Sequence, residues 1–362
     1  MSKAKRLIAA VLSVMFIIPA LAGCGNKAAS AGTDVTANAG ADDGKINVVT
    51  TIFPEYDWVM NILGDKATDA NVTMLLDNGV DLHSFQPTAE DIMKIADSDI
   101  FIYVGGESDG WVDDALAEAT NKDMIVINLL EVLGDSVKEE EVVEGMQAED
   151  EHDHDHGEDE DADEHDHDED GDEHEHEHDE EEPEYDEHVW LSLKSTQVVC
   201  DAIEKALETA DPDDAAEYQS NLASYKSELS ALDAEYEKVV ADAKVKTILF
   251  GDRFPFRYMV DDYGLDYYAA FVGCSAESEA SFETVIFLAG KVDELNLPAI
   301  LTIEGADHKI AETVRENTTG KDAEILTMNS MQSVTSEDVK SGVSYINIMK
   351  DNLTTLKKAL GE

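Results

Sequence analysis

Residues 149–187 cannot contribute to a hydrophobic core, and this divides the chain. The segment, here called the acidic tract, holds 26 Asp or Glu and eight His in 39 residues, with almost no apolar side chain. Such a segment cannot bury enough apolar surface to offset the entropy lost on ordering, so we expect it to be disordered. The folded structure therefore has to be built from the residues before and after it.

The histidines of the acidic tract indicate metal capture. Imidazole nitrogen alternating with carboxylate oxygen is a donor set that borderline divalent ions such as Zn²⁺ prefer. A solvated acidic face would explain the carboxylates alone, but His-rich tracts are typical of metal binding. The predicted accessory ligands are His152, His154, His156, His165, His167, His174, His176 and His178.

The N-terminus carries the features of an export signal. Lys3, Lys5 and Arg6 precede an apolar run over residues 7–22, and Cys24 follows Leu-Ala-Gly. A charged start, a short apolar run and small residues at the cleavage point are typical of secretory signals. The Leu-Ala-Gly-Cys segment resembles the bacterial lipobox, whose cysteine becomes the lipidated first residue. An ordinary signal peptide that contains a cysteine is the alternative.

The mature protein is then expected outside the cytoplasm. Residues 1–24 form the predicted signal, and residues 25–45, which are small, polar and rich in Gly and Ala, form a flexible tether. This arrangement places a folded domain on the outer face of the bacterial cytoplasmic membrane, held there by the lipid on Cys24.

Charge and cysteine content narrow the possible partners and crosslinks. The net charge of −57, nearly half of it from the acidic tract, attracts cations and repels nucleic acid. Export would permit a disulfide between Cys200 and Cys274. Metal ligation by either cysteine is not favoured, because neither lies in a Cys-x-x-Cys spacing.

The rest of the chain alternates between apolar, β-rich runs and helical periods, which predicts an α/β fold with parallel sheets flanked by helices. About 270 residues remain, enough for two lobes of ordinary size. We assign residues 46–210 to an N-terminal lobe, with an acidic His-rich loop inserted at 138–187, and residues 245–362 to a C-terminal lobe. Expected strands lie at 46–53, 71–76, 100–105, 124–130, 247–251, 266–271, 299–304 and 323–328, and expected helices include 88–96, 281–295 and 336–360.

A long helix over residues 211–244 is expected to join the lobes as a rigid spine. It would start at Asp211 and Pro212, and be about 45 Å long. Apolar residues recur along it at steps of three and four. A coiled-coil dimer is the alternative explanation of this stripe. Because the stripe covers only three heptads between two α/β halves, we favour an intramolecular helix in a monomer.

Three histidines lie outside the acidic tract, and two of them are candidate ligands. His83 is in a polar loop between the strand at 71–76 and the helix at 88–96, and His188 is where the tract rejoins the fold. Loops that follow parallel strands usually contact the ligand. An isolated histidine is more often structural, but two of them beside a metal-capturing tract favour ligation. His308 is at a helix start and is expected at the surface.

The same residues give the chain a family resemblance. The motif D-x-H-x-F-x-P-T at 81–88, the segment E-H-V-W-L at 187–191, the spine helix and the lipobox resemble the cluster A-I substrate-binding lipoproteins of metal ABC transporters, especially the zinc-binding branch. The resemblance covers residues 46–362. It implies two α/β lobes with the metal in the cleft between them, His83 and His188 as the first two ligands, and an ABC permease as the partner.

The C-terminal half departs from that family's pattern. The family places a third histidine where this chain has Arg253, whose guanidinium stays protonated and cannot ligate. Its late acidic ligand would fall at residues 329–332, where there is no carboxylate. We predict that Asp252 or Glu304, both at expected strand ends, supplies oxygen to the site. The alternatives are an ion pair with an arginine for Asp252 and a helix cap for Glu304.

The sequence therefore predicts an extracytoplasmic lipoprotein that binds a divalent metal as substrate and passes it to an ABC permease without catalysis. Zinc is the first choice and manganese the alternative. An exported metallohydrolase is less favoured, because no His-Glu-x-x-His helix or nucleophile and base pair is found. A metal buffer or adhesin is the third possibility.

Replacing Cys24 by serine should release the protein from the membrane, because the lipid on this residue is the expected anchor. Fractionation of cells producing Cys24→Ser should find the variant in the medium or periplasm, whereas the wild type stays with membranes. A variant that still needed detergent for extraction would contradict the lipobox assignment.

Overall fold

Each half of the chain forms a four-stranded parallel sheet, as the alternation of strands and helices predicts. The structure, a computed structural model, describes residues 44–147, 184–275, 279–305 and 307–362. The strands are β1 (Ile46–Thr50), β2 (Ala70–Met74), β3 (Ile100–Tyr103), β4 (Ile125–Asn128), β5 (Thr247–Phe254), β6 (Asp266–Val272), β7 (Ala299–Ile303) and β8 (Glu324–Met328). Their order is β2-β1-β3-β4 in the N-terminal sheet and β6-β5-β7-β8 in the C-terminal sheet.

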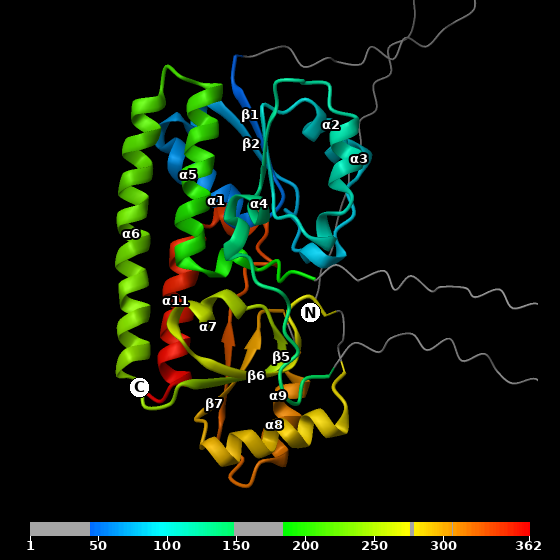
Figure 1. The fold of residues 1–362 in the computed structure, drawn as a ribbon, viewed down its shortest axis with the longest axis vertical. Coiled ribbons are helices and arrows are strands. Elements are labelled where there is room, and N and C mark those ends of the chain that lie inside the picture. The colour runs from blue at the N-terminus through cyan, green and yellow to red at the C-terminus, as the bar shows by residue number, and fades with distance from the viewer. Residues whose placement is uncertain (1–43, 148–183, 276–278, 306) are drawn as a thin grey trace, which may run out of the picture. The chain divides into compact units, whose positions relative to one another are not determined.

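Helices connect and cover the strands (Figure 1). They are α1 (Phe53–Leu63), α2 (Ala89–Ala96), α3 (Val112–Ala117), α4 (Leu129–Leu133), α5 (Leu193–Ala210), α6 (Ala215–Asp242), α7 (Arg257–Tyr263), α8 (Phe282–Leu295), α9 (Lys309–Asn317), α10 (Ser336–Lys340) and α11 (Tyr345–Ala359). Short 3₁₀ turns include η2 (Leu82–Ser84), η3 (Glu107–Asp109) and η5 (Val189–Leu191). Within the described ranges, no helix has both the length and the apolar content to cross a bilayer.

The two central strands of the C-terminal sheet, β5 and β7, are mostly buried on both faces, which explains their apolar sequences. Successive side chains of a strand point to opposite faces. In β5, Leu249 belongs to an apolar cluster shared with α8 and α9. Its neighbours Ile248 and Phe250 belong to the larger cluster that includes α6 and α11. That larger cluster also contains the core of the N-terminal sheet, so the two lobes share one hydrophobic core.

Helix α6 is the predicted spine, and it packs within its own chain. Its 28 residues span about 42 Å. Its apolar stripe is buried against α5 and α1 in one lobe and α11 in the other, and Figure 1 shows α6 running alongside α5 and α11. Helix α6 starts later than predicted. Asp211 is the residue that ends α5, and Asp214 is the residue before α6. The Tyr218 hydroxyl of α6 donates a hydrogen bond to Asp211.

Two helix boundaries test what the sequence predicted about where helices start and end. The predicted capping box is present, because Thr88 accepts from the Asp91 amide and Asp91 accepts from that of Thr88. The single helix expected at 336–360 is wrong, since the chain breaks into α10 and α11. Gly342 has φ of 96°, and Ser344 caps α11 by accepting from the Asn347 amide.

Some residues of the acidic His-rich loop that was predicted at 138–187 belong to the folded structure. Residues 138–147 form backbone hydrogen bonds with other parts of the fold. The Gln147 amide, for example, donates to the Ala270 carbonyl of β6. The structure resumes at Glu184, and Asp186 and Glu187 are buried. Residues 1–43, with the signal, Cys24 and nearly all of the tether, and residues 148–183, with all eight tract histidines, lie outside the described residues.

Asp57 links the two lobes through a buried carboxylate. It lies on α1 and accepts a hydrogen bond from the Tyr345 amide at the start of α11, 3.2 Å away, and from Asn61. Burial raises the pKa of Asp57 to about 6, above the value of about 3.9 expected in the unfolded chain. The folded state therefore binds more protons between these two values, and this residue makes stability fall as pH rises from about 4 to about 6.

Replacing Asp57 by asparagine should raise the free energy of unfolding at pH 7 by on the order of 2 kcal/mol, because the buried charge is removed while the hydrogen bond from Tyr345 is kept. Near pH 4 the variant and the wild type should differ little. Denaturant unfolding at several pH values measures this, with Asp351→Asn on the exposed side of α11 as the control. Equal pH dependence of Asp57→Asn and wild type would contradict the prediction.

Candidate metal centre

His83 lies in η2, in the loop that follows β2. The Asp81 side chain accepts a hydrogen bond from the His83 amide at 3.0 Å and so fixes this turn. The His83 Nδ1 atom is 2.8 Å from Ser108 Oγ and 3.4 Å from Glu187 Oε2. Because a carboxylate only accepts, Nδ1 carries the ring hydrogen and the Nε2 lone pair is free to bind a metal.

His188 is fully buried and is held by a carboxylate two residues earlier. Asp186 Oδ1 accepts from the His188 amide at 2.9 Å and faces its Nδ1 at 3.1 Å. Metal-binding histidines commonly use such a carboxylate to fix the ring and its tautomer. Nε2 therefore points away from Asp186, and it lies 3.2 Å from Nε2 of His83. The structure brings together the two histidines that the sequence singled out.

Cys274 joins them from the C-terminal lobe. One ligating atom each of His83, His188 and Cys274 lies within 4.8 Å of the others. Cys274 follows β6, and its amide donates to Glu140 Oε1 at 3.1 Å. The preceding Gly273 permits this approach, since a Cβ there would be 2.9 Å from Cε1 of His188. Both Cys200 and Cys274 are free thiols in this structure, so it contains no bond between them.

The thiol of Cys274 is protonated without a metal. Burial, and then the carboxylate of Glu140, raise the pKa of Cys274 well above its usual value. A divalent cation reverses this, because its positive charge favours the thiolate. The same cysteine is then a strong ligand for a soft or borderline ion.

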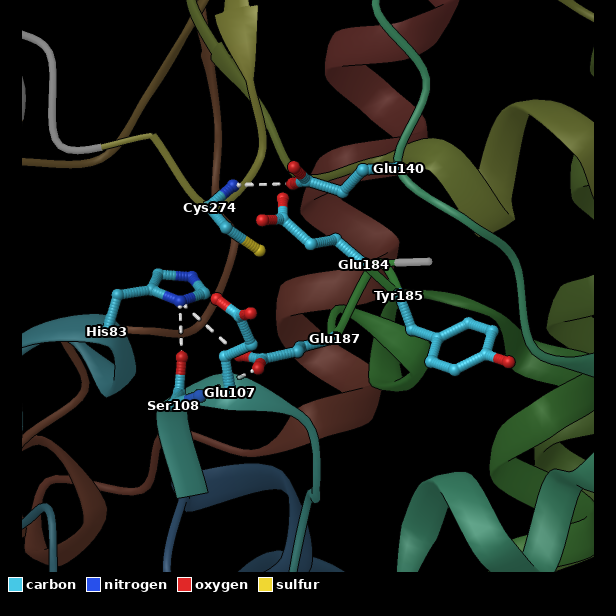
Figure 2. A pocket seen from close by; sticks show the side chains of 8 residues that line it. All are labelled: His83, Glu107, Ser108, Glu140, Glu184, Tyr185, Glu187 and Cys274. Carbon is cyan, nitrogen blue, oxygen red and sulfur yellow. Dashed lines mark hydrogen bonds and ion pairs between the residues drawn. The ribbon is translucent and has the colours of Figure 1, made fainter. Parts of the chain in front are cut away.

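An acidic cavity of about 260 Å³ opens beside these ligands. Figure 2 shows the side chains of His83 and Cys274 on the left of the cavity and those of Glu140, Glu184 and Glu187 to their right. The residues that line the cavity are His83, Glu107, Ser108, Glu140, Glu184, Tyr185, Glu187 and Cys274. A cavity with this lining attracts cations and excludes anions.

Two carboxylates at the site are kept ionised. Burial would raise the pKa of Glu187, but hydrogen bonds from His83 and Ser108 hold it below its usual value. Burial also opposes ionisation of Asp81, and the guanidinium of Arg253, 2.8 Å away, lowers the pKa of Asp81. Both groups therefore add negative charge next to the histidines at neutral pH.

Asp252 and Glu304, the predicted oxygen ligands, lie outside the group of converging ligand atoms found among the described residues. Asp252 accepts from the amides of Arg253 and Ile303, and so ties β5 to β7 where the β5 register shifts. Glu304 accepts from Ser330 N, Ser330 Oγ and the Gln332 amide. The carboxylate oxygens of both residues thus accept hydrogen bonds from backbone amides.

Arg253 has a different partner from the one expected. The ion pair with an arginine that was the alternative for Asp252 is not found among the described residues, and the Arg253 guanidinium contacts Asp81 in the other lobe. His308 is half-buried at the start of α9 and does not join the converging ligand atoms.

Sequence reasoning missed Cys274, Asp186 and the orienting role of Asp81. No spacing motif pointed to Cys274, because no second candidate ligand lies near it in the sequence. Asp186 and Asp81 each lie two residues before a histidine, and this Asp-x-His spacing was a usable signal.

Comparisons with known proteins identify the family of this chain. Residues 48–359 match the family described as zinc-uptake complex component A, periplasmic. The zinc-binding lipoprotein AdcA of Streptococcus pneumoniae is 31% identical over 318 residues, covering 87% of this chain and 56% of AdcA. The high-affinity zinc uptake system protein ZnuA of Bacillus subtilis is 30% identical over 350 residues, covering 97% of this chain and 96% of ZnuA.

A solved structure extends the likeness to the fold. The Zn(II)-bound ZnuA-like domain of Streptococcus pneumoniae AdcA superposes with a TM-score of 0.63 at 26% identity, covering 88% of this chain and all of that domain. The chain spans about half the length of the AdcA proteins, which are longer. Taken together, the matched residues and the shared fold show that this chain belongs to the zinc-uptake complex component A family.

Proposed function

We propose that this protein is the extracytoplasmic binding component of a metal uptake system and that its substrate is a divalent transition metal, zinc first. One observation carries the proposal: Nε2 of His83 and Nε2 of His188 face each other at 3.2 Å. Two nitrogens bound to one tetrahedral zinc at about 2.05 Å are about 3.3 Å apart. The two rings therefore already have the spacing that a shared zinc ion needs.

The donor set favours zinc over manganese. Two imidazoles and a thiolate suit a borderline ion such as Zn²⁺, whereas Mn²⁺ is better served by carboxylate, carbonyl and water. The proposed ligands are His83, His188 and Cys274, and Cys274 takes the place that the sequence gave to Asp252 or Glu304. Relatives named as zinc-binding or zinc uptake proteins support this choice.

Delivery and attachment complete the proposal. The protein would hand the ion to an ABC permease, and the lipid on Cys24 would keep it at the outer face of the membrane. The name of the AdcA lipoprotein supports this location. The proposed chemistry is binding and release, in which no covalent bond of a substrate changes.

The three ligands can be tested one at a time. His83→Ala, His188→Ala and Cys274→Ser should each weaken zinc binding by at least about a hundredfold, since even partners that only orient a ligand are worth 10- to 100-fold. Isothermal titration calorimetry with Zn²⁺ measures this, with His308→Ala as the control that keeps wild-type affinity. Asp252→Ala should also keep the tight site if its fold is intact. Wild-type affinity in all three ligand variants would place the site elsewhere.

The acidic tract should add weak sites without being needed for the tight one, because an unstructured segment loses entropy for each ion that it wraps. Deleting the whole tract would also remove residues 184–187, which belong to the fold. We therefore expect replacement of the eight tract histidines by asparagine to remove several weak Zn²⁺ sites in the same titration, while one strong site is kept. Loss of the strong site would show that the tract is the main binding element.

A further inference from the structure

Arg253 connects the loop that carries His83 to the loop that carries Cys274. It is the next-to-last residue of β5, a central strand of the C-terminal sheet. Its Nη2 atom donates to Asp81 Oδ2 in the N-terminal lobe at 2.8 Å, and its Nη1 atom donates to the carbonyl of Ser275 at 3.3 Å. Ser275 directly follows Cys274 and is 1% exposed. One guanidinium therefore contacts a close neighbour of each of two proposed ligands, which belong to different lobes.

Asp81 passes this contact on to His83. Its Oδ1 atom accepts from the His83 amide at 3.0 Å and lies 4.0 Å from Nε2 of the same residue. Its other oxygen is the one that the guanidinium of Arg253 contacts. Because the two oxygens belong to one rigid carboxylate, a shift of the guanidinium shifts the turn from which His83 extends. The position of the His83 ring relative to Cys274 thus depends on Arg253.

An arginine suits this bridge better than a lysine would. The guanidinium is planar and carries five N–H donors in a fixed geometry, so that it can donate to acceptors on two loops at once. A lysine places all its donors on one nitrogen at the end of a flexible stem. The side chains of Arg253 and Asp81 are 20% and 26% exposed, and ion pairs that solvent reaches add little to overall stability. We therefore expect the effect of Arg253 at the metal centre rather than on the stability of the whole fold.

On the basis of the proposed function, we propose that Arg253 is a positioning residue of the metal centre, which holds His83 and Cys274 at their separation across the lobes and slows release of the bound ion. An ion with ligands from both lobes is released when the lobes move apart, and the contact between Arg253 and Asp81 opposes that movement. The guanidinium does not bind the ion. Its pairing with Asp81 offsets the repulsion that it would otherwise exert on a divalent cation.

A purely electrostatic role for Arg253 makes the opposite prediction. If only its charge mattered, removing the charge would tighten the binding of a divalent cation, and a lysine would behave like the arginine. If the guanidinium positions the two loops, its removal weakens binding and speeds release. A lysine then restores little, because one ammonium cannot take both acceptors in the same geometry.

Four full-length proteins separate these roles: the wild type, Arg253→Ala, Arg253→Lys and the control Arg315→Ala. Arg315 is a half-buried arginine on α9 in the same lobe. Each protein would be titrated with Zn²⁺ and, separately, with Co²⁺, and the rate of Zn²⁺ release to a chelator would be measured by stopped flow.

Arg253→Ala should weaken Zn²⁺ binding at least about tenfold and speed release by a similar factor, since partners that orient a ligand are worth 10- to 100-fold. Arg253→Lys should lie nearer to the alanine variant than to the wild type, and Arg315→Ala should match the wild type. At saturating Co²⁺ the thiolate charge-transfer band of Cys274 should be weaker in Arg253→Ala. A general loss of stability would leave that band of the folded, loaded protein unchanged.

A double-mutant cycle with Asp81→Asn tests the path through Asp81. Asparagine keeps an oxygen for the His83 amide and removes the charged partner of Arg253. The effects of Asp81→Asn and Arg253→Ala on Zn²⁺ affinity should therefore add up to less than their sum, as they do for residues in one network. If Arg253→Ala does not fold, Arg253→Lys and its own cycle with Asp81→Asn carry the test.

The outcomes distinguish this inference from the proposed function. Zn²⁺ binding by Arg253→Ala that equals or exceeds that of the wild type would overturn the positioning role. Full recovery in Arg253→Lys, or strictly additive effects in the cycle, would overturn it as well. A wild type with no tight Zn²⁺ site, or with no thiolate band for Co²⁺, would instead overturn the proposed function or its cysteine ligand.

Discussion

The hydrogen bonds of Asp186 hold the centre of this structure together. A fully buried imidazole needs a partner for its polar atoms, and Asp186 supplies one to both the amide and the ring of His188. The backbone of Asp186 connects the lobes at the same time. Its amide donates to the Lys138 carbonyl, and its carbonyl accepts from Tyr258 of α7. The residue that orients one ligand thus also joins the segment after the acidic tract to the C-terminal lobe.

The positions of the other proposed ligands follow from that anchor. His188 is followed by η5, where the Trp190 indole donates to the carbonyl of Ser330 at 2.8 Å. This contact brings the loop after β8 to the histidines. On another side, Gly273 lets the end of β6 approach the His188 ring, and Cys274 comes with it. The segments are packed around a shared core that holds the proposed ligand atoms close together, and ligand groups held in place lose less entropy on binding.

Charge explains why the arrangement suits a cation. Asp81 and Glu187 are held ionised and Asp186 faces a ring N–H, whereas Arg253 is paired with Asp81 across the lobes. Like charges held close in a buried region repel one another unless a positive charge lies between them. A divalent ion between His83, His188 and Cys274 would supply that charge. The acidic cavity next to the ligands extends the same preference outward to the solvent.

The sequence by itself determined the fold class, the paired sheets, the spine helix and the two histidines. These depend on local patterns: strand and helix periods, a capping box at Thr88 and Asp91, and the short motifs at 81–88 and 187–191 that contain the two histidines. Tertiary structure alone decided the rest of the site. Cys274, the proposed third ligand, follows β6 in the other lobe, and the oxygens of Asp252 and Glu304 accept hydrogen bonds from nearby backbone amides. No local pattern records which loop ends converge, because that depends on how two sheets pack through one core.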